Sequence, residues 1–539
     1  MLLRRPGVTY EALREGFAWQ IPARFNMGAA CADRHPSGDL ALVEIAADGA
    51  RRDVTFGELT ELSNRFANAL RGLGVATGDR VGIVLPQRLE TGLAHLAVYK
   101  LGAIAVPLSG LFGPDALRYR LGDSDARAVV TDAAALDRVA EVARELGGME
   151  VIVAGPGAAP PHRDFWDLTR SGSADLEVAA TEADTPALLI YTSGTTGPPK
   201  GALHGQRVLL GHLPGFDLSH DFFPQPGDRF WTPADWAWIG GLMDALAPSW
   251  YHGRPVVAAA RQAFDPAWAT DLLRRHGVRN AFLPPTALKL MRQAGVRVPH
   301  GTLRSVMSGG EPLGEELQSW GRDALGVWIN EIYGQTEANY VVGNSSAVWE
   351  VRPGSMGRPY PGHDVVVLRD DGSPAAAGEV GEIAVRAPDP VLFLAYWGRP
   401  DATREKVVEG WLRTGDLGRI DGDGWFWFEA RADDVINSAG YRIGPAEIEE
   451  CLLHHPAVAL AAAIGVPDEV RGQVVKAFVK LADGATPSEE LKEEIRSLVR
   501  SRLAAYEYPR HIEFVDALPM TTTGKIRRAE LRRIEAERR

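Results

Sequence analysis

From about residue 80, short apolar runs alternate with amphipathic segments such as 315–325. Buried runs of about five to seven residues, rich in Val, Ile and Ala and separated by helices, are typical of βαβ units with parallel strands. The pattern also predicts a helix over 56–73. The predicted strands are 80–86, 103–108, 126–132, 149–155, 186–194, 254–260, 280–286 and 303–310.

The pattern changes at about residue 355. Short alternating strands joined by DDG, GEVGE and DGDG turns predict antiparallel structure. After 431–437 the order is a helix, two strands and a helix, which is enough for a small α+β domain. We therefore predict an α/β protein with a large N-terminal domain (1–432) and a small mobile C-terminal domain (433–539). The helices and strands of the small domain are predicted at 445–454, 459–467, 474–481 and 487–503.

Composition narrows the possible partners. The chain has 539 residues, which predicts more than one domain, and its net charge of −12 disfavours nucleic acid or an anionic membrane as a partner. The arginines after residue 526 alternate with glutamates, as on a solvated helix. The two cysteines are too few for a disulfide framework. Without a signal-like start or a spanning apolar run, the expected location is cytoplasmic.

The segment YTSGTTGPPKG (191–201) is the most informative motif. Its hydroxyl groups, glycine amides and Lys200 follow a predicted buried strand and suit phosphate oxygens. A Walker A loop would need Gly-Lys-Ser/Thr at the start of a helix. Here Pro199 precedes Lys200 and Gly201 follows it, so a Walker A loop is excluded.

Three further motifs carry charge on Gly-containing turns. EIYGQTEANY (331–340) places Glu337 beside a hydroxyl, which suits Mg²⁺ shared with phosphates. GWLRTGDL and the following hairpin supply Asp416 and Arg431, and PMTTTGKIRRAEL supplies Lys525. Each motif alone also fits a solvated loop or an ordinary hairpin.

Together these motifs resemble the adenylate-forming superfamily of acyl-CoA synthetases, peptide-synthetase adenylation domains and luciferases. TSGTTGPPKG, YGQTE, TGD, GYRIGPAEIE and TGKIRR occur in family order between about residues 40 and 535. The segments WTPADWAWIGG (231–241) and SAGYRIGPAEIEECLLHHPAV (438–458) are most similar to the acetyl-CoA and medium-chain acyl-CoA synthetases. The resemblance implies ATP, Mg²⁺ and coenzyme A as cofactors. A carboxylic acid would become its acyl-adenylate with release of pyrophosphate, and coenzyme A would then displace AMP.

By this resemblance, three segments of the N-terminal domain would hold ATP. The loop after the strand at 186–194 would take the β- and γ-phosphates, with Thr192 and Glu337 near Mg²⁺. The segment after the strand at 303–310 would line the adenine, and Tyr333 would stack on it. The residues implied are Thr192, Ser193, Gly194, Thr195, Thr196, Gly197, Lys200, Gly309, Gly310, Glu311, Pro312, Tyr333, Gly334, Gln335 and Thr336.

Three charged residues would serve the chemistry. Asp416 would accept hydrogen bonds from the ribose hydroxyls, and Arg431 would lie near the ribose and phosphates. Lys525 would reach between the carboxylate and the α-phosphate, where it offsets charge as one anion attacks another. Lys525 also resembles sites that protein acetyltransferases modify in acyl-CoA synthetases, and acetylation would remove its charge. Neither cysteine is assigned a catalytic role.

Relatives rotate the C-terminal domain between the two half-reactions, about a hinge that corresponds to Asp433. The rotation would withdraw Lys525 and bring the Gly440 loop to the site. The positions that match coenzyme A contacts are Ser438, Gly440, Tyr441, Arg442 and Arg471. The phosphates of coenzyme A would give both arginines a role, and a surface salt bridge is the alternative for each.

The acyl group would lie along Trp238, Gly240 and Gly241, although at least one of the three nearby tryptophans is expected in the core. Acetate-specific relatives close the pocket with a tryptophan at the position of Gly334. We therefore expect a short-to-medium or branched acid of roughly four to eight carbons. An aromatic acid is an alternative. The family's usual glycine before the motif tryptophan is Ala237 here, so the pocket shape stays open.

Three other functions fit parts of the pattern. A free-standing enzyme that loads a carrier protein would share the adenylation motifs, and no carrier segment follows Lys525. A luciferase-type oxygenase would share them too. A non-catalytic nucleotide-binding regulator is disfavoured because Lys525 and Glu337 are both present. The acid and the oligomeric state are not fixed by the sequence.

Overall fold

The computed structural model describes residues 8–538 except 193–197, 260, 262, 433, 439–440, 469–470, 504–506 and 522–524. The chain forms two compact units, Met1–Val365 with Val385–Leu412 and Val366–Ala384 with Arg413–Arg539. The predicted domain boundary at Ala432–Asp433 lies within the second unit and stays a prediction. Asp433 lies outside the described residues.

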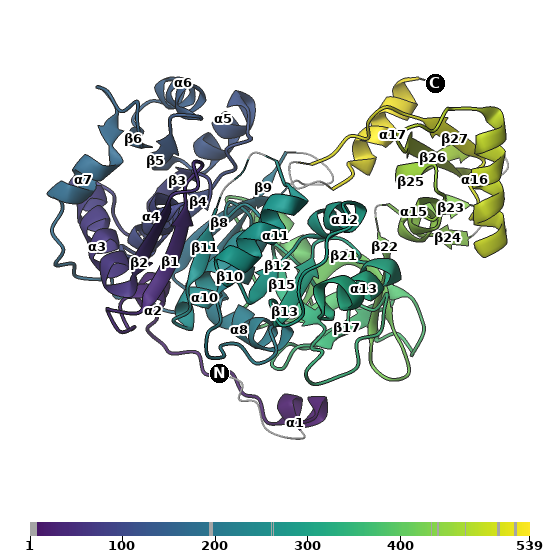
Figure 1. The fold of residues 1–539 in the computed structure, drawn as a ribbon, viewed down its shortest axis with the longest axis horizontal. Coiled ribbons are helices and arrows are strands. Elements are labelled where there is room, and N and C mark those ends of the chain that lie inside the picture. Colours follow the sequence, from purple (N-terminus) through teal and green to yellow (C-terminus); the bar gives the residue numbers. More distant parts are fainter. Residues whose placement is uncertain are drawn as a thin grey trace. The chain divides into compact units, whose positions relative to one another are not determined.

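Eight described strands of the first unit form a mixed sheet in the order β19-β9-β8-β4-β3-β5-β6-β7 (Figure 1). The strands from β8 to β7 pair in parallel, whereas β9 and β19 are antiparallel. Their apolar faces are buried, as predicted for βαβ units. The bounds are β3 Arg80–Val84, β4 Ile104–Pro107, β5 Ala126–Asp132, β6 Glu150–Ala154, β7 Arg163–Asp164, β8 Pro186–Thr192, β9 Lys200–Gly205 and β19 Ala395–Tyr396.

Nine described strands form a second sheet in the order β16-β15-β14-β13-β12-β10-β11-β1-β2. The run from β14 to β1 is parallel, and β2, β15 and β16 are added antiparallel at its two edges. The bounds are β1 Leu40–Ile45, β2 Arg51–Thr55, β10 Phe230–Trp231, β11 Val256–Ala258, β12 Asn280–Phe282, β13 Ser305–Gly309, β14 Ile329–Gln335, β15 Ala338–Gly343 and β16 Arg358–Pro359.

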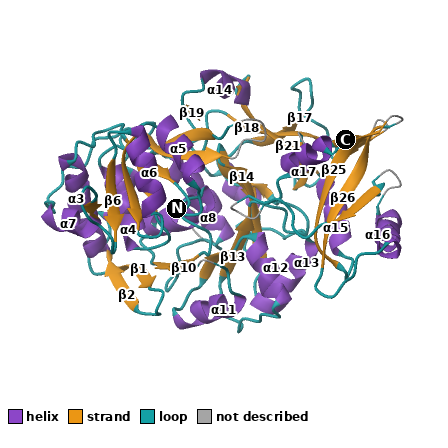
Figure 2. Ribbon diagram, turned by 90° about the horizontal axis from the view of Figure 1, so that it is seen from above, coloured by secondary structure: helices purple, strands orange, loops and turns teal. Residues whose placement is uncertain are grey.

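Helices cover the strands of this unit (Figure 2). The helix predicted over 56–73 is α3, Phe56–Gly72, whose N-cap Thr55 accepts a hydrogen bond from the amide of Glu58. The segment 315–325 starts as α13 and continues as a π-helical turn, Gly321–Leu325. The other helices are α1 Tyr10–Glu15, α2 Met27–Ala32, α4 Leu89–Lys100, α5 Pro114–Asp123, α6 Leu136–Leu146, α7 Phe165–Ser171, α8 Val208–Ser219, α9 Ile239–Gly241, α10 Ala247–Tyr251, α11 Pro266–Arg275, α12 Pro285–Gln293, α13 Glu315–Trp320 and α14 Pro400–Lys406.

The chain passes between the two units inside three strands of a five-stranded sheet, in the order β17-β18-β21-β20 with β22 paired to β21. The pairs β20–β21 and β21–β22 are antiparallel, as the DGDG turn predicted. The bounds are β17 Val365–Leu368, β18 Gly381–Arg386, β20 Val407–Val408, β21 Trp411–Ile420 and β22 Phe426–Arg431.

The rest of the second unit is a mixed sheet, β24-β23-β26-β25 with β27 parallel to β26. Helices α15 and α16 contribute to one apolar core, and Leu531 of α17 contributes to another. Arg528 pairs with Glu449 and Asp434, so the basic C-terminal helix carries intramolecular ion pairs. The bounds are β23 Ile436–Ser438, β24 Tyr441–Ile443, α15 Pro445–Leu453, β25 Val458–Asp468, β26 Gly472–Leu481, α16 Glu489–Arg502, β27 His511–Phe514 and α17 Arg528–Glu537.

The predicted fold class, α/β with an antiparallel region and a smaller α+β part, is confirmed. In the part of the chain that the structure describes, no helix is both long enough and apolar enough to cross a bilayer.

Candidate active site

The predicted phosphate loop connects β8 to β9 as an antiparallel hairpin. Thr192 and Lys200 are register partners, and the Thr192 hydroxyl donates to the Lys200 carbonyl over 3.3 Å. Lys200 begins a strand, whereas a Walker A lysine begins a helix, so the exclusion of a Walker A loop is confirmed. Ser193, Gly194, Thr195, Thr196 and Gly197 lie outside the described residues.

A tyrosine that the sequence analysis missed joins Lys200 to Glu337. Tyr396 lies on β19, opposite Ala202 of β9. The Lys200 ammonium is 5.2 Å from the centre of the Tyr396 ring. The Tyr396 hydroxyl donates a hydrogen bond to Glu337 Oε1. Glu337 is buried, and its carbonyl accepts from the amide of Phe393 over 2.9 Å. Two motifs that are far apart in the sequence therefore meet through one aromatic side chain.

The two segments predicted to bind adenine lie at the ends of two neighbouring parallel strands, β13 and β14. Gly309 on β13 is the register partner of Ile332 on β14, so the segments after them start at the same sheet edge. A Cβ on Gly309 would lie 2.6 Å from Ile332 Cγ1, and Gly310 has a φ of 96°, so both positions favour glycine. Glu311 and Pro312 follow directly, before α13 begins at Glu315.

The YGQTE segment lies at the end of β14 and in the turn to β15. Tyr333 is buried, whereas Gly334, Gln335 and Thr336 are partly exposed. The Gln335 side-chain carbonyl accepts from Lys406 Nζ over 2.9 Å. The turn therefore presents polar groups at the edge where Gly309 ends β13.

Our expectation of open space beyond Gly334 is wrong for the direction of its own side chain. A Cβ there would lie 2.4 Å from the Tyr340 amide nitrogen and 2.7 Å from Asn339 Cα, because β15 folds back against β14. A Cβ on Gly241 would lie 2.3 Å from the Asp235 carbonyl oxygen. Both glycines are thus explained by close backbone packing.

Gly240 differs from Gly334 and Gly241. At this partly exposed position, the nearest atoms to a Cβ would belong to the Phe282 ring, at 2.8 Å, and to Asp244 Oδ2, at 3.7 Å. Trp238 is also partly exposed and packs edge-on against Phe112, with ring centres 5.8 Å apart. The neighbouring Trp231 and Trp236 are fully buried, which confirms that tryptophans of this segment belong to the core.

In the second unit, Asp416 on β21 and Arg431 on β22 are register partners. Arg431 Nη1 donates to Asp416 Oδ1 over 3.0 Å, and the aspartate is buried while the arginine is about one-third exposed. A positive φ of 74° at Gly415 lets the strand turn just before the aspartate. The two residues that the motifs singled out therefore form one ion pair.

The remaining predicted residues also lie in the second unit. Lys525 is exposed, and its amide and carbonyl both bond to Thr521, over 3.0 and 2.7 Å. Ser438 is buried on β23, where it pairs with Gly472, the neighbour of Arg471. Tyr441 and Arg442 belong to β24, but their side chains, like Gly440, lie outside what the structure describes.

Both cysteines are buried, and desolvation raises the pKa of the Cys31 thiol to about 12. A thiol with such a raised pKa is a poor nucleophile near neutral pH. This agrees with our assignment of no catalytic role to Cys31.

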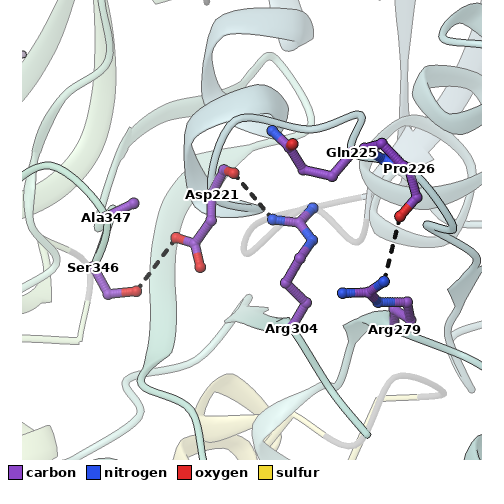
Figure 3. A pocket seen from close by; sticks show the side chains of 7 residues that line it. All are labelled: Asp221, Gln225, Pro226, Arg279, Arg304, Ser346 and Ala347. Atoms are coloured by element: carbon purple, nitrogen blue, oxygen red, sulfur yellow. Dashed lines mark hydrogen bonds between the residues drawn. The ribbon is translucent and has the colours of Figure 1, made fainter. Parts of the chain in front are cut away.

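Figure 3 shows the side chains that line a separate pocket of about 420 Å³. This pocket lies at the amino ends of β12 and β13, opposite Gly309. Its Arg279 and Arg304 directly precede β12 and β13, whereas Gly309 ends β13. Arg304 makes two hydrogen bonds to the buried Asp228, of 2.9 and 2.6 Å, so its charge is already offset. Ligands of open parallel sheets bind outside the carboxyl ends of the strands. The candidate active site therefore lies at the carboxyl end of β13, where Gly309 is the last residue.

Two family models match the chain. Residues 29–397 match the model described as AMP-binding enzyme, and residues 447–525 match the AMP-binding enzyme C-terminal domain. The chain belongs to the AMP-binding enzyme family. The first match includes Thr192, Lys200 and Glu337, and the second ends at Lys525.

Similar proteins narrow the class. The chain is 34% identical to an acetyl-coenzyme A synthetase of Bacillus subtilis (strain 168), with 90% of this chain and 86% of the relative covered. It is 32% identical to the mitochondrial acyl-coenzyme A synthetase ACSM3 of Mus musculus, with 98% and 93% covered. The crystal structure of the anthranilate CoA ligase AuaEII in complex with anthranoyl-AMP superposes with a TM-score of 0.87 at 30% identity, covering 96% of this chain and 98% of the other.

These relatives confirm the resemblance that the motifs indicated and the predicted enzyme class, an AMP-forming acid–thiol ligase. The family uses ATP and coenzyme A. Which acid this enzyme activates is a separate question, because its relatives act on different acids.

Proposed function

We propose that this AMP-binding enzyme transfers the AMP group of ATP to a short-to-medium-chain or branched carboxylic acid, with release of pyrophosphate. It then transfers the acyl group to coenzyme A, with release of AMP. The observation that carries the proposal is the meeting of Lys200, Tyr396 and Glu337 beside the hairpin that starts at Thr192. A cation and a hydroxyl suit phosphate oxygens, and a buried carboxylate suits a divalent cation.

The site residues fit Mg²⁺ held jointly with a nucleotide. Mg²⁺ prefers oxygen ligands and is usually bound by one or two carboxylates plus substrate phosphates. Glu337 offers such a carboxylate, oriented by the Tyr396 hydroxyl, and Thr192 offers a hydroxyl. When bound, the metal would neutralise charge on the phosphate oxygens.

For adenylation, the protein supplies position and charge. Glycines 309 and 310 let backbone approach the adenine, and the buried Asp416 accepts hydrogen bonds from the ribose. Arg431 orients Asp416 and brings positive charge to the nucleotide. Lys525 stabilises the negative charge that develops between the attacking carboxylate and the α-phosphate. Because Lys525 is exposed, it is also a suitable substrate for a protein acetyltransferase.

For the thioester step, we expect arginines of the second unit to bind the phosphates of coenzyme A. Arg500 hydrogen-bonds to Tyr508 and holds the pKa of that phenol below its ordinary value, with weaker contributions from the charges of Arg510 and Arg471. The guanidinium of Arg500 also lies 4.2 Å from the centre of the Tyr508 ring. Guanidinium groups suit phosphate, and Arg471 adjoins the strand that pairs with Ser438. Arg500 also forms an ion pair with Glu493 over 3.4 Å, which offsets part of its charge.

A screen for coenzyme A ligation over acids of two to ten carbons, with branched and aromatic members, tests the proposal. Aromatic acids belong in the screen because a similar structure is an anthranilate CoA ligase. We expect carboxylate-dependent ATP–pyrophosphate exchange together with thioester formation. Exchange without any thioester would favour loading of a carrier protein, and preference for acetate would contradict the proposed substrate class.

A further inference from the structure

A buried acid stands next to the segment that we assign to the acyl group. Asp244 lies on a π-helical turn, Leu242–Leu246, that directly follows Gly240 and Gly241. π-Helical turns are rare and are often found at functional sites, because they redirect side chains. The Asp244 side chain is only 3% exposed. Burying a carboxylate is costly unless hydrogen-bond donors face it.

The hydrogen bonds around Asp244 leave one of its oxygens without a described donor. His212 Nδ1 lies 2.7 Å from the Val208 carbonyl, so Nδ1 carries the proton and Nε2 accepts from Asn339 Nδ2 over 3.1 Å. The second amide hydrogen of Asn339 goes to Asp244 Oδ1, over 2.6 Å. Among the described residues, no other side chain or amide donates to this carboxyl group.

The second oxygen, Oδ2, faces the partly exposed Gly240. A methyl group at Gly240 would lie 3.7 Å from it and 2.8 Å from Cε1 of the Phe282 ring. The Phe282 ring and a carboxyl oxygen of Asp244 thus lie nearest to the space beside Gly240. Desolvation raises the pKa of Asp244 well above its ordinary value, and the hydrogen bond from Asn339 opposes this. A further donor at Oδ2 would likewise stabilise the carboxylate form, which accepts hydrogen bonds.

We propose that Asp244 determines acyl specificity, and that the substrate is a carboxylic acid whose acyl group bears a hydrogen-bond donor, either a hydroxyl or an amino group. The donor would bond to Oδ2 while the apolar part of the acid packs on Phe282. A site built to hydrogen-bond such a group rejects analogues that lack it, because the protein oxygen is then left unpaired. The proposal rests on the proposed function, since it concerns the same acid.

Paired substrates test the inference. Butanoate, hexanoate and benzoate are each compared with their hydroxy and amino derivatives, one position at a time, by kcat/KM for thioester formation. We expect one position at which a donor is preferred at least tenfold, as for a hydrogen bond to a charged or acidic group. The hydroxy and amino series distinguish the two kinds of donor.

Asp244→Asn keeps the shape and replaces Oδ2 by an amide that donates, so the preference for a donor should disappear or reverse. Gly240→Ala tests the same region in a second way, because its methyl group would lie 3.7 Å from Oδ2 and the Phe282 ring, 2.8 Å away, would have to move. The matched control is Asp228→Asn, which alters a buried aspartate at the opposite sheet edge. It should lower stability without changing the ratio between paired acids.

The outcomes separate the inference from the function on which it rests. If no carboxylic acid supports thioester formation, the proposed function fails. If plain acids are used as well as donor-bearing ones, or if both variants change the paired acids equally, the role of Asp244 is overturned while the proposed function stands.

Discussion

Arg431 and Asp416 face each other across an antiparallel hairpin, and the guanidinium donates to the buried carboxylate over 3.0 Å. The pairing fixes the carboxylate from one side, and the partial exposure of Arg431 leaves part of its guanidinium accessible. A carboxylate oriented in this way is suited to bind two neighbouring ribose hydroxyls. This ion pair explains why two residues fifteen positions apart in the sequence lie together in one hairpin.

Asp416→Asn should raise the KM for ATP about tenfold or more, because a charged acceptor of hydrogen bonds becomes neutral and its pair with Arg431 weakens. Steady-state kinetics with ATP as the varied substrate measure this. The matched control is Glu429→Gln, which alters the Arg419–Glu429 ion pair on the same hairpin. An equal rise in both variants would mean that the hairpin, and not this carboxylate, supports ATP binding.

Tyr396→Phe removes the hydroxyl that bonds to Glu337 and keeps the ring beside Lys200. We expect a higher requirement for Mg²⁺ and a loss of roughly tenfold in kcat/KM for ATP, since Glu337 loses its orienting donor. Titrations of magnesium at fixed ATP provide the measurement. Tyr10→Phe, which removes a buried hydroxyl bonded to the Pro359 carbonyl, should leave the magnesium dependence unchanged. An unaltered magnesium profile in Tyr396→Phe would remove this residue from the site.

Much of the fold follows from local sequence. The apolar runs at 126–132 and 186–194 predict strands because burial on both faces of a parallel sheet selects Val, Ile and Leu. Tyr396 could not be found in that way, since its role comes from the antiparallel register of β19 on β9. The error at Gly334 has the same origin. A glycine in a sequence shows that a side chain is missing, but only the fold shows that backbone fills the space.

The buried His212 should make the enzyme sensitive to mild acid. Desolvation lowers the pKa of His212 to about 4, whereas an unfolded histidine titrates near 6.5. The unfolded chain therefore takes up a proton first, so stability present above about pH 6.5 is lost as the pH falls toward 4. Between pH 7 and pH 5 this residue should account for about 2 kcal/mol of lost unfolding free energy.

Urea unfolding of wild type and His212→Gln at pH 7 and pH 5 measures this loss. The variant should be less stable at pH 7, because Asn339 loses its acceptor, but should lose less stability on acidification. The exposed His300 offers a control, since His300→Gln should keep the full acid response. Parallel pH profiles for wild type and His212→Gln would contradict the assignment.

Gly334→Ala should lower stability by about 1–3 kcal/mol, because its methyl group meets the backbone of β15. Activity should then fall to a similar degree for short and long acids, because no pocket floor is altered. Gly72→Ala, where a methyl group meets no neighbour, is the matched control and should be neutral or slightly stabilising. A selective increase in activity on acetate in Gly334→Ala would instead show that Gly334 lines the acyl pocket.

Substitution of Lys525 tests whether this residue acts in adenylation only or in both half-reactions. If its charge stabilises only the transition state of adenylation, Lys525→Ala should slow that step by orders of magnitude, since one positioned charge supplies about 3–4 kcal/mol. Thioester formation from supplied acyl-adenylate should persist, because coenzyme A attacks a carbon and not a phosphorus. Lys525→Gln, which imitates acetylation, should behave in the same way, and the exposed Lys480→Ala should change neither rate. Pyrophosphate exchange and thioester formation measured separately decide the matter, and equal loss of both rates would show that Lys525 serves the whole cycle.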